Sequence, residues 1–573
     1  MTHRAGGVPT PRAAFRALTR TFLRRFFDNE ITGGTDDTRT SFFWLIAFLA
    51  APLTLLPVSA MIRYRIIVLN FGGEALRLLS RPHKTFVITL GMTAAALIAA
   101  VVWHSLMLDR RDGLILGTLP IRGRTIVLSK LAALAIYVFG IAAAMHGVSS
   151  VLFGIALADG ATSIRAALLA PAAHFIATVA SAAFVFLCVT AAQGLALTVA
   201  GPAGFRRVSP ILQVALVCAI VIGFTKMGAI VDGVARFNQL KNSSPPEGWL
   251  LLAPPVWFLG LYEWILGGAG PVFDGLARTA VIAFTMVTIV TLVSYVMVYR
   301  RVMVRAVETP ETGSTWRVAA LFEWVTRRLS RLPVSRAAAQ FFFTSLGRVE
   351  RLRFVVAVTL GLVAAWIVPA VVLLTANGGG ETTPRATFAL SYATLALVLI
   401  GLRIAISMPA DLRAAWVRPL VDPPVRQVRS GLWRALFSAS VLPVTVAFGA
   451  IDVWLWTLRV ALLHGLVMTA IGVLLVELAL WHFDDLPSSR PWRPEHANLR
   501  LWWPAYLVGF TTLTGTLSQL EWTFIDEPAA SFVLAAVFVI MAIALRIAHR
   551  RPYPPESFDI ETYVEPPQML KLN

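Results

Sequence analysis

Charged residues gather in one short stretch of an otherwise apolar chain, between residues 103 and 130. A long apolar run ends in this stretch, and another begins just after it. Proline lacks a backbone N–H and disfavours helix at the residue before it, so the Leu-Pro dipeptide at 119–120 marks a turn. We expect a short helix over residues 109–117, the turn, and then the next apolar helix. This stretch, named here the first charged loop, contains Asp109, Arg110, Arg111, Asp112, Leu119, Pro120, Arg122, Arg124 and Lys130.

The order of residues in the first charged loop resembles one family of membrane proteins. The pattern from Asp109 to Lys130 is an acid and two arginines, then Leu-Pro, Arg and Lys. This pattern is similar to the one found in the permease subunits of ABC-2-type exporters. In that family this loop is the cytoplasmic coupling element that touches a separate ATPase subunit. The resemblance implies that two copies of an ABC ATPase subunit bind here and hold ATP-Mg, with no cofactor bound by this chain. The alternative is a basic loop that only sets the topology.

Ionisable side chains inside the apolar runs are the other candidates for chemistry. Such groups are costly in a bilayer and often mark a substrate or proton pathway. A neutral histidine can instead bond to a neighbouring helix, and a long arginine side chain can reach the membrane surface. The candidates for intramembrane polar sites are His104, His146, His174, Arg403, His464 and Glu477.

The motifs of common enzyme classes are missing from the sequence. There is no G-x-x-x-x-G-K-[ST] phosphate loop, and none of the five lysines follows a glycine. Neither a G-x-S-x-G nor an H-E-x-x-H motif occurs. Cys188 and Cys218 lie within apolar runs, where they are expected to pack as small residues rather than to form a disulfide. We therefore expect no catalytic residue, no metal site and a chain that is not an enzyme.

Composition places the chain in a membrane. Its 573 residues are 57% hydrophobic and only 14% charged, and the mean hydropathy is +0.72. A charge at the centre of a bilayer costs roughly 2.5–3.5 kcal/mol on insertion scales, so the few charges must gather in loops. Because Lys and Arg are enriched in cytoplasmic loops, the net charge of +19 does not indicate a nucleic-acid partner. Membrane lipids are the expected surroundings.

The apolar runs predict an all-α polytopic membrane protein with about twelve transmembrane helices in two six-helix halves. About 20 apolar residues are needed to cross a bilayer. The candidate spans are 41–61, 85–107, 131–157, 171–199, 209–230, 276–299, 355–375, 386–408, 435–452, 459–482, 501–520 and 529–548.

The distribution of bases predicts that both termini lie in the cytoplasm. With that orientation the cytoplasmic segments carry 37 Lys and Arg residues and the opposite side carries 12. The loop 62–84 does not fit this orientation, because it holds five bases yet falls on the side opposite the cytoplasm. A re-entrant first run would be the alternative, but it would place the N-terminus outside, so we treat this loop as an exception.

The segment 231–275 is predicted to be the longest external segment. The Pro254-Pro255 pair interrupts any continuous helix there. The aromatic residues of this segment suit a belt at the membrane interface, and they are Trp249, Trp257, Tyr262 and Trp264. A short amphipathic piece before the sixth span also occurs in ABC-2 permeases.

Amphipathic segments are predicted before each half. Arginines recur every four residues from Arg12 to Arg24, and apolar residues recur at three and four from Phe15 to Phe26. On a helix this spacing gives one cationic and one apolar face, typical of a helix in the membrane interface, although packing on protein is the alternative. The expected parts are 1–40 (N-terminal helix), 41–299 (first half), 300–354 (linker with an amphipathic helix), 355–548 (second half) and 549–573 (C-terminal tail).

The second half repeats the first weakly. A shift of 302 residues lays span 85–107 over span 386–408 and Asp109 over Asp411. Residues 409–431, named here the second charged loop, lack the Leu-Pro of the first. The repeat suggests a single-chain pseudo-dimer in which the second loop also contacts an ATPase. The candidate coupling residues of this loop are Asp411, Arg413, Trp416 and Arg418.

The leading hypothesis is the permease subunit of an ABC-type exporter that moves an unidentified substrate across the bacterial inner membrane. The alternative is a proton-coupled twelve-span transporter of the major facilitator type. The loop signature of that family, Gly-x-x-x-Asp-Arg-x-Gly-Arg-Arg, is poorly matched by DRRDG at 109–113. A membrane-embedded enzyme is a third class, and the loop 483–500 with Asp484, Asp485 and His496 is its only support.

Overall fold

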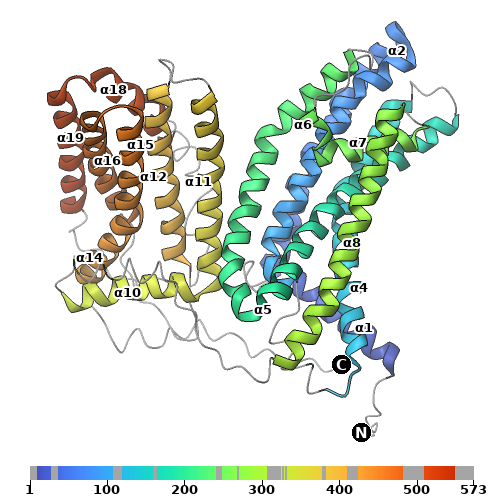
Figure 1. Cartoon of the computed structure of the whole chain (residues 1–573), viewed down its shortest axis with the longest axis horizontal. Helices are drawn as coiled ribbons and strands as arrows, with labels where there is room; N and C mark the ends of the chain where they lie inside the picture. The colour runs from blue at the N-terminus through green and yellow to red at the C-terminus, as the bar shows by residue number, and fades with distance from the viewer. Residues whose placement is uncertain are drawn as a thin grey trace. The chain divides into compact units, whose positions relative to one another are not determined.

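The chain is helical and divides into two compact units, Met1–Thr312 and Gly313–Asn573. Each unit is described by itself (Figure 1). All the regular structure in the described residues is helix. The computed structural model describes residues 10–27, 36–106, 116, 119–158, 164–239, 248–267, 270–305, 324, 328, 332–376, 383–408, 424–481, 509–510 and 512–548.

Nine helical segments in the described residues are long and apolar enough to cross a membrane. The protein is therefore a multi-pass membrane protein, which confirms the predicted class. The count of nine differs from the predicted twelve for local reasons. The first two predicted spans share one helix, the seventh has its qualifying apolar part only over Leu352–Ala365, and the eleventh lies partly outside the described residues.

Unit 1 begins with an amphipathic helix and ends with a long apolar one. Its helices, with short pieces between them, are α1 (Pro11–Phe27), α2 (Asp36–Val101), η1 (Trp103–Ser105), α4 (Gly123–Ala158), α5 (Ile164–Gln239), α6 (Gly248–Leu251), α7 (Pro254–Ile265) and α8 (Pro271–Arg305). Helices α6 and α7 lie near one end of the unit and α1 lies near the other (Figure 1).

Helix α2 consists of two arms that fold back on each other at Gly72. Gly72 has φ 81° and ψ 175°, a backbone region that glycine occupies without a side-chain clash. The Tyr64 hydroxyl lies 2.6 Å from Nδ1 of His83, although 19 residues of straight helix would separate them by roughly 28 Å. The arms are therefore antiparallel. The expected loop over 62–84 is wrong, because these residues are helical on both sides of Gly72.

Helix α5 reverses in the same way at Gly201, which has φ 68°. The Gln193 side chain donates to the Trp103 carbonyl over 3.2 Å, and the Trp103 indole N–H donates to Oγ of Ser209 over 3.0 Å. Residues on both sides of Gly201 thus meet one residue of η1. Each of the two long helices α2 and α5 therefore supplies two passes through the unit.

The apolar face of α1 packs on the beginning of α4. Phe22 and Phe26 are buried, and the Lys130 ammonium of α4 lies 4.8 and 5.1 Å from their ring centroids. Phe26 also stacks on Tyr137 with 4.8 Å between centroids. The arginines of α1 at positions 12, 16, 20 and 24 are exposed. The predicted amphipathic helix is confirmed, and Phe22 and Phe26 of its apolar face pack on protein.

Unit 2 repeats this order of elements. Its helices are α10 (Pro333–Arg348), α11 (Glu350–Ala376), α12 (Thr383–Ser407), α14 (Val425–Leu436), the π-helix η3 (Phe437–Val441), α15 (Leu442–Leu455), α16 (Leu458–Ala479), the π-helix η4 (Thr512–Thr516), α18 (Leu517–Phe524) and α19 (Pro528–Ala548). Helices α10 and α14 lie at one end of this unit and α18 lies at the other (Figure 1).

In each unit the amphipathic helix contacts the helix in which a charged loop ends. Helix α4 begins at Gly123 and α14 begins at Val425, which are 302 positions apart, the shift that the sequence repeat predicts. Helix α10 approaches α14 closely, because a Cβ atom at Gly431 would lie 2.1 Å from the carbonyl oxygen of Ser335. The weak sequence repeat therefore corresponds to a repeated arrangement of helices.

We expect Gly431→Ala to loosen the contact between α10 and α14. A methyl group forced against a backbone oxygen typically costs roughly 1–3 kcal/mol of unfolding free energy. The matched control is Gly449→Ala on α15, where a Cβ would meet nothing within 4 Å. In thermal unfolding of the purified protein in detergent, the first variant should melt earlier than the parent and the control should not. Equal melting of both variants would contradict the close packing.

Candidate functional site

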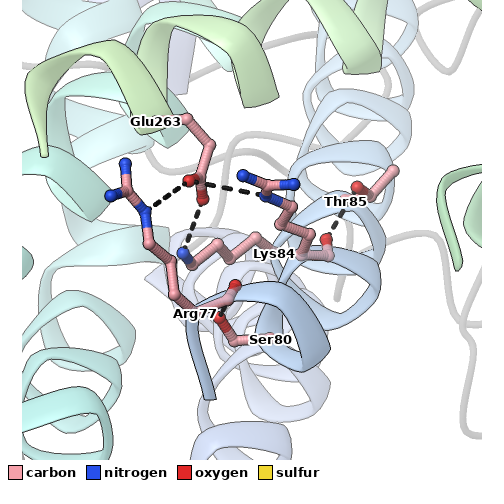
Figure 2. A network of polar contacts seen from close by, with 6 residues as sticks. Arg77, Ser80, Lys84, Thr85 and Glu263 are labelled. Carbon is pink, nitrogen blue, oxygen red and sulfur yellow. Dashed lines mark hydrogen bonds and ion pairs between the residues drawn. The ribbon is translucent and has the colours of Figure 1, made fainter. Parts of the chain in front are cut away.

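Three bases on the second arm of α2 converge on one carboxylate of α7. Arg77, Arg81 and Lys84 are spaced by four and three residues, so they share one helix face. Glu263 lies opposite them (Figure 2). Lys84 Nζ is 2.7 Å from Oε1 of Glu263, and the Nε atoms of Arg77 and Arg81 are 3.2 and 3.5 Å from its Oε2. We name these four residues the unit 1 cluster.

Most of the unit 1 cluster is removed from solvent. The exposed fractions of the side chains are 0% for Glu263, 1% for Lys84, 3% for Arg81 and 36% for Arg77. The Lys84 ammonium also lies 4.5 Å from the ring centroid of Tyr262, a cation–π geometry. Burial favours the neutral acid, but Lys84, Arg81 and Arg77 outweigh it and lower the pKa of Glu263 below its usual value. The carboxylate is therefore held ionised by its partners.

The unit 1 cluster explains the exception in the predicted loop charges. Three of the five bases in 62–84 are held by Glu263 inside the unit rather than displayed in a loop. Tyr262 is fully buried beside them, so its assignment to an interfacial aromatic belt is wrong. Trp249 and Trp264 are 43% and 56% exposed, as residues of such a belt would be.

His174 of α5 occupies a closed aromatic site next to this cluster. Its ring stacks on Phe153 at 4.7 Å and meets the Tyr262 ring edge-on at 5.6 Å. Nε2 lies 3.2 Å from Oγ of Ser149, whereas Nδ1 has no hydrogen-bond partner in the described part of the chain. His146 is also buried and packs against Gly91, where a Cβ atom would lie 2.5 Å from the imidazole ring.

A second buried group of polar side chains lies in unit 2. The Nδ1 atom of His464, on α16, is 3.0 and 3.1 Å from the two carboxylate oxygens of Glu521 on α18. The Tyr392 hydroxyl of α12 donates to Oε2 of Glu521, and Oγ of Ser391 is 2.9 Å from Nε2 of His464. Asp452 of α15 is also fully buried. We name these five residues the unit 2 cluster.

The predicted polar residues thus fall into different surroundings. The structure brings His464 together with Glu521, and His174 with Ser149. Glu477 pairs with Arg429 at 3.2 Å and Arg546 at 3.8 Å, rather than with His464. Arg403 donates to Ser407 at 2.6 Å. The side chain of His104 lies outside the described residues.

Only part of the predicted coupling surface is described. Leu119, Pro120, Arg122 and Arg124 are exposed at the start of α4. The Thr125 N–H donates to the Arg122 carbonyl over 2.8 Å, so the chain enters α4 directly from the turn. The other predicted coupling residues lie outside the described residues, and they are Asp109, Arg110, Arg111, Asp112, Asp411, Arg413, Trp416 and Arg418.

Sequence reasoning missed the acids that organise both clusters. Glu263 and Glu521 each precede the last long helix of a unit and lie among apolar residues. Each is a lone carboxylate in a mainly apolar run, and this signal was available. Asp452 was missed for the same reason. No group of three or more His, Cys, Asp or Glu side chains in the described ranges has an arrangement that could hold a metal ion.

We expect Glu263→Gln to destabilise the protein by roughly 3–5 kcal/mol, because it leaves buried cations without their carboxylate. The control is Arg77→Gln, which removes the most exposed member of the same cluster and should cost at most about 1 kcal/mol. Thermal unfolding in detergent measures both. A Glu263→Gln protein as stable as Arg77→Gln would contradict the structural role of the cluster.

Comparison with known proteins leaves the site to be interpreted from its own geometry. No protein-family model, no curated protein and no solved structure matches this chain. The function is therefore interpreted from a multi-pass helical chain with two units. In each unit an amphipathic helix packs on the helix into which a charged loop leads in the sequence, and acids are buried in the helical core.

Proposed function

We propose that this protein is the transmembrane permease subunit of an ABC-type exporter. The proposal combines the multi-pass helical fold with the resemblance of the first charged loop to ABC-2 permeases. A separate ATPase, in two copies, binds ATP-Mg and contacts the charged loops from the cytoplasm. The substrate crosses the cytoplasmic membrane along a path between helices.

The observation that supports coupling best is the contact between α1 and α4. A loop that transmits force has to be joined to a helix that moves with it. The first charged loop runs directly into α4, and α1 is packed on the first turns of that helix through Phe22, Phe26 and Lys130. A push on the loop would therefore move α1 and α4 together.

The same arrangement in unit 2 supports a single-chain pseudo-dimer. Helix α10 is packed on α14, which contains the last residues of the second charged loop, as α1 is packed on α4. The antiparallel arms of α2 and α5 support six passes in the first half, and we extend this to about twelve in the chain. Both termini then lie in the cytoplasm.

The unit 1 cluster would make the opposite end of this unit rigid. It joins the second arm of α2 to α7 by ion pairs that are largely closed to solvent. In this proposal, motion begins at the charged-loop end, and the α6–α7 end keeps its packing while the helices tilt. The cluster therefore has a structural role in transport rather than a role in substrate binding.

Photo-crosslinking from the first charged loop tests the proposal. A photoreactive amino acid placed at Arg110 should crosslink a nucleotide-binding protein in native membranes, and the crosslink should be lost in the Asp109→Ala, Arg111→Ala double variant. The same probe at Trp264, which is exposed on α7, is the positional control and should not capture that protein.

A charge-matched control distinguishes an effect specific to the first charged loop from a general effect of removing charged side chains. The pair Arg63→Ala, Glu74→Ala removes one base and one acid that are exposed on α2 near Gly72, and it should leave the crosslink unchanged. Capture of no nucleotide-binding protein from Arg110, with the protein present in the membrane, would overturn the proposed coupling.

A further inference from the structure

His464 has hydrogen-bonding partners on both sides of its ring. Its ring is stacked on Phe388 at 4.2 Å with an interplanar angle of 7°, and the Tyr392 ring meets it edge-on at 5.6 Å. In the plane of the ring, Nδ1 faces Glu521 and Nε2 faces Ser391. The packing fixes the orientation of the imidazole, so each ring nitrogen keeps its own partner.

The Ser391 hydroxyl is suited to both charge states of His464. Its Oγ lies 2.7 Å from the Phe388 carbonyl and 2.9 Å from Nε2, but it has one proton to donate. With neutral imidazole, Ser391 donates to Nε2 while Nδ1–H donates to Glu521. With imidazolium, Ser391 donates to the Phe388 carbonyl and accepts a hydrogen bond from Nε2–H. A rotation of one hydroxyl therefore accommodates a proton on His464 without moving any helix.

The two units compensate their buried acids differently. Glu263 pairs with three bases, two of them arginines that stay charged at any physiological pH. In the described residues Glu521 has its ion pair with His464, whose ring can bind or release a proton. The acid of the unit 2 cluster thus depends for its counter-charge on a histidine, whereas two of the three bases around Glu263 are arginines.

Asp452 strengthens this dependence. It is fully buried, and neither carboxylate oxygen has a hydrogen-bond partner in the described residues. It is close enough to interact electrostatically with His464 and Glu521. With Asp452 neutral, Glu521 ionised and His464 protonated, the cluster has no net charge. Loss of one proton leaves a negative charge in the helical core, which is costly.

Other charged groups that the structure describes on the surrounding helices are engaged elsewhere. On α16, Arg459 donates to the Asp526 carbonyl over 2.7 Å, and Glu477 pairs with Arg429 of α14 and Arg546 of α19. From α12, Tyr392 and Ser391 face the cluster, from α15 Asp452, and from α18 Glu521. The π-helix η4 directly precedes α18, and π-helical turns are frequent at functional sites.

We propose that the His464–Glu521 pair is a proton-binding site in the core of unit 2. The proton enters from water and resides on the imidazole, with the Glu521 carboxylate as its counter-ion and Ser391 as acceptor for Nε2–H. The site gives the chain a ligand, the proton, that the proposed coupling to an ATPase does not supply. It stands on the geometry of unit 2 and does not depend on that coupling.

Nitrogen NMR of histidine-labelled protein in lipid bilayers tests the site directly. The ¹⁵N shifts distinguish imidazolium from neutral imidazole, and His464→Gln identifies the signal. We expect both forms of His464 to be detected as the pH is varied, because Glu521 faces Nδ1 and Ser391 can accept a hydrogen bond from Nε2–H. His174, identified by His174→Gln, is the matched control, because it has the same Ser, Phe and Tyr neighbours but no carboxylate bonded to its ring. It should stay neutral throughout.

Two variants test whether Glu521 and Ser391 stabilise the protonated form of His464. Glu521→Gln should lower the ratio of imidazolium to imidazole of His464 at fixed pH at least about tenfold, because an adjacent carboxylate stabilises the charged ring by that much or more. Ser391→Ala should lower it in the same direction, and it provides a test if Glu521→Gln does not fold. The control Ser149→Ala should leave His464 unchanged. A His464 signal that keeps one form over the whole range, or that ignores Glu521→Gln or a folded Ser391→Ala, would overturn the proposal.

Discussion

A charge buried among the helices of a membrane protein has to be compensated within the protein, because neither lipid nor the helical core solvates it. The unit 1 cluster meets this constraint with three bases around Glu263. The contact fixes the second arm of α2 against α7 and places Tyr262 over Lys84. These ion pairs help to fix the position of α7, which also packs through Phe258 and Leu259 in an apolar cluster.

The same constraint has a different solution in unit 2. There a carboxylate on the short helix before the last span meets a histidine rather than lysine and arginine. The repeated order of helices makes the difference informative, because the two acids hold equivalent places before α8 and α19. Three bases, two of them arginines, compensate the acid of one half, and a histidine compensates the acid of the other.

Periodicity and hydropathy predicted what depends on local sequence. The amphipathic pattern from Arg12 to Phe26 predicted α1, and the apolar runs predicted the multi-pass helical class. The reversal at Gly72 was read as a loop, because the bases of 62–84 suggested exposure and their partner is 179 residues away from Lys84. Glu263 and Glu521 were missed since single acids show no spacing. His464 was predicted, but its partner depends on tertiary packing.

The proposed function makes this chain one subunit of a larger transport complex. Mild-detergent purification of the tagged chain from its native host, followed by mass spectrometry and measurement of ATP hydrolysis, tests it most directly. We expect a nucleotide-binding subunit at two copies per chain, and ATP hydrolysis that is lost when that subunit is removed. A chain that purifies alone and carries out transport without ATP hydrolysis would contradict it.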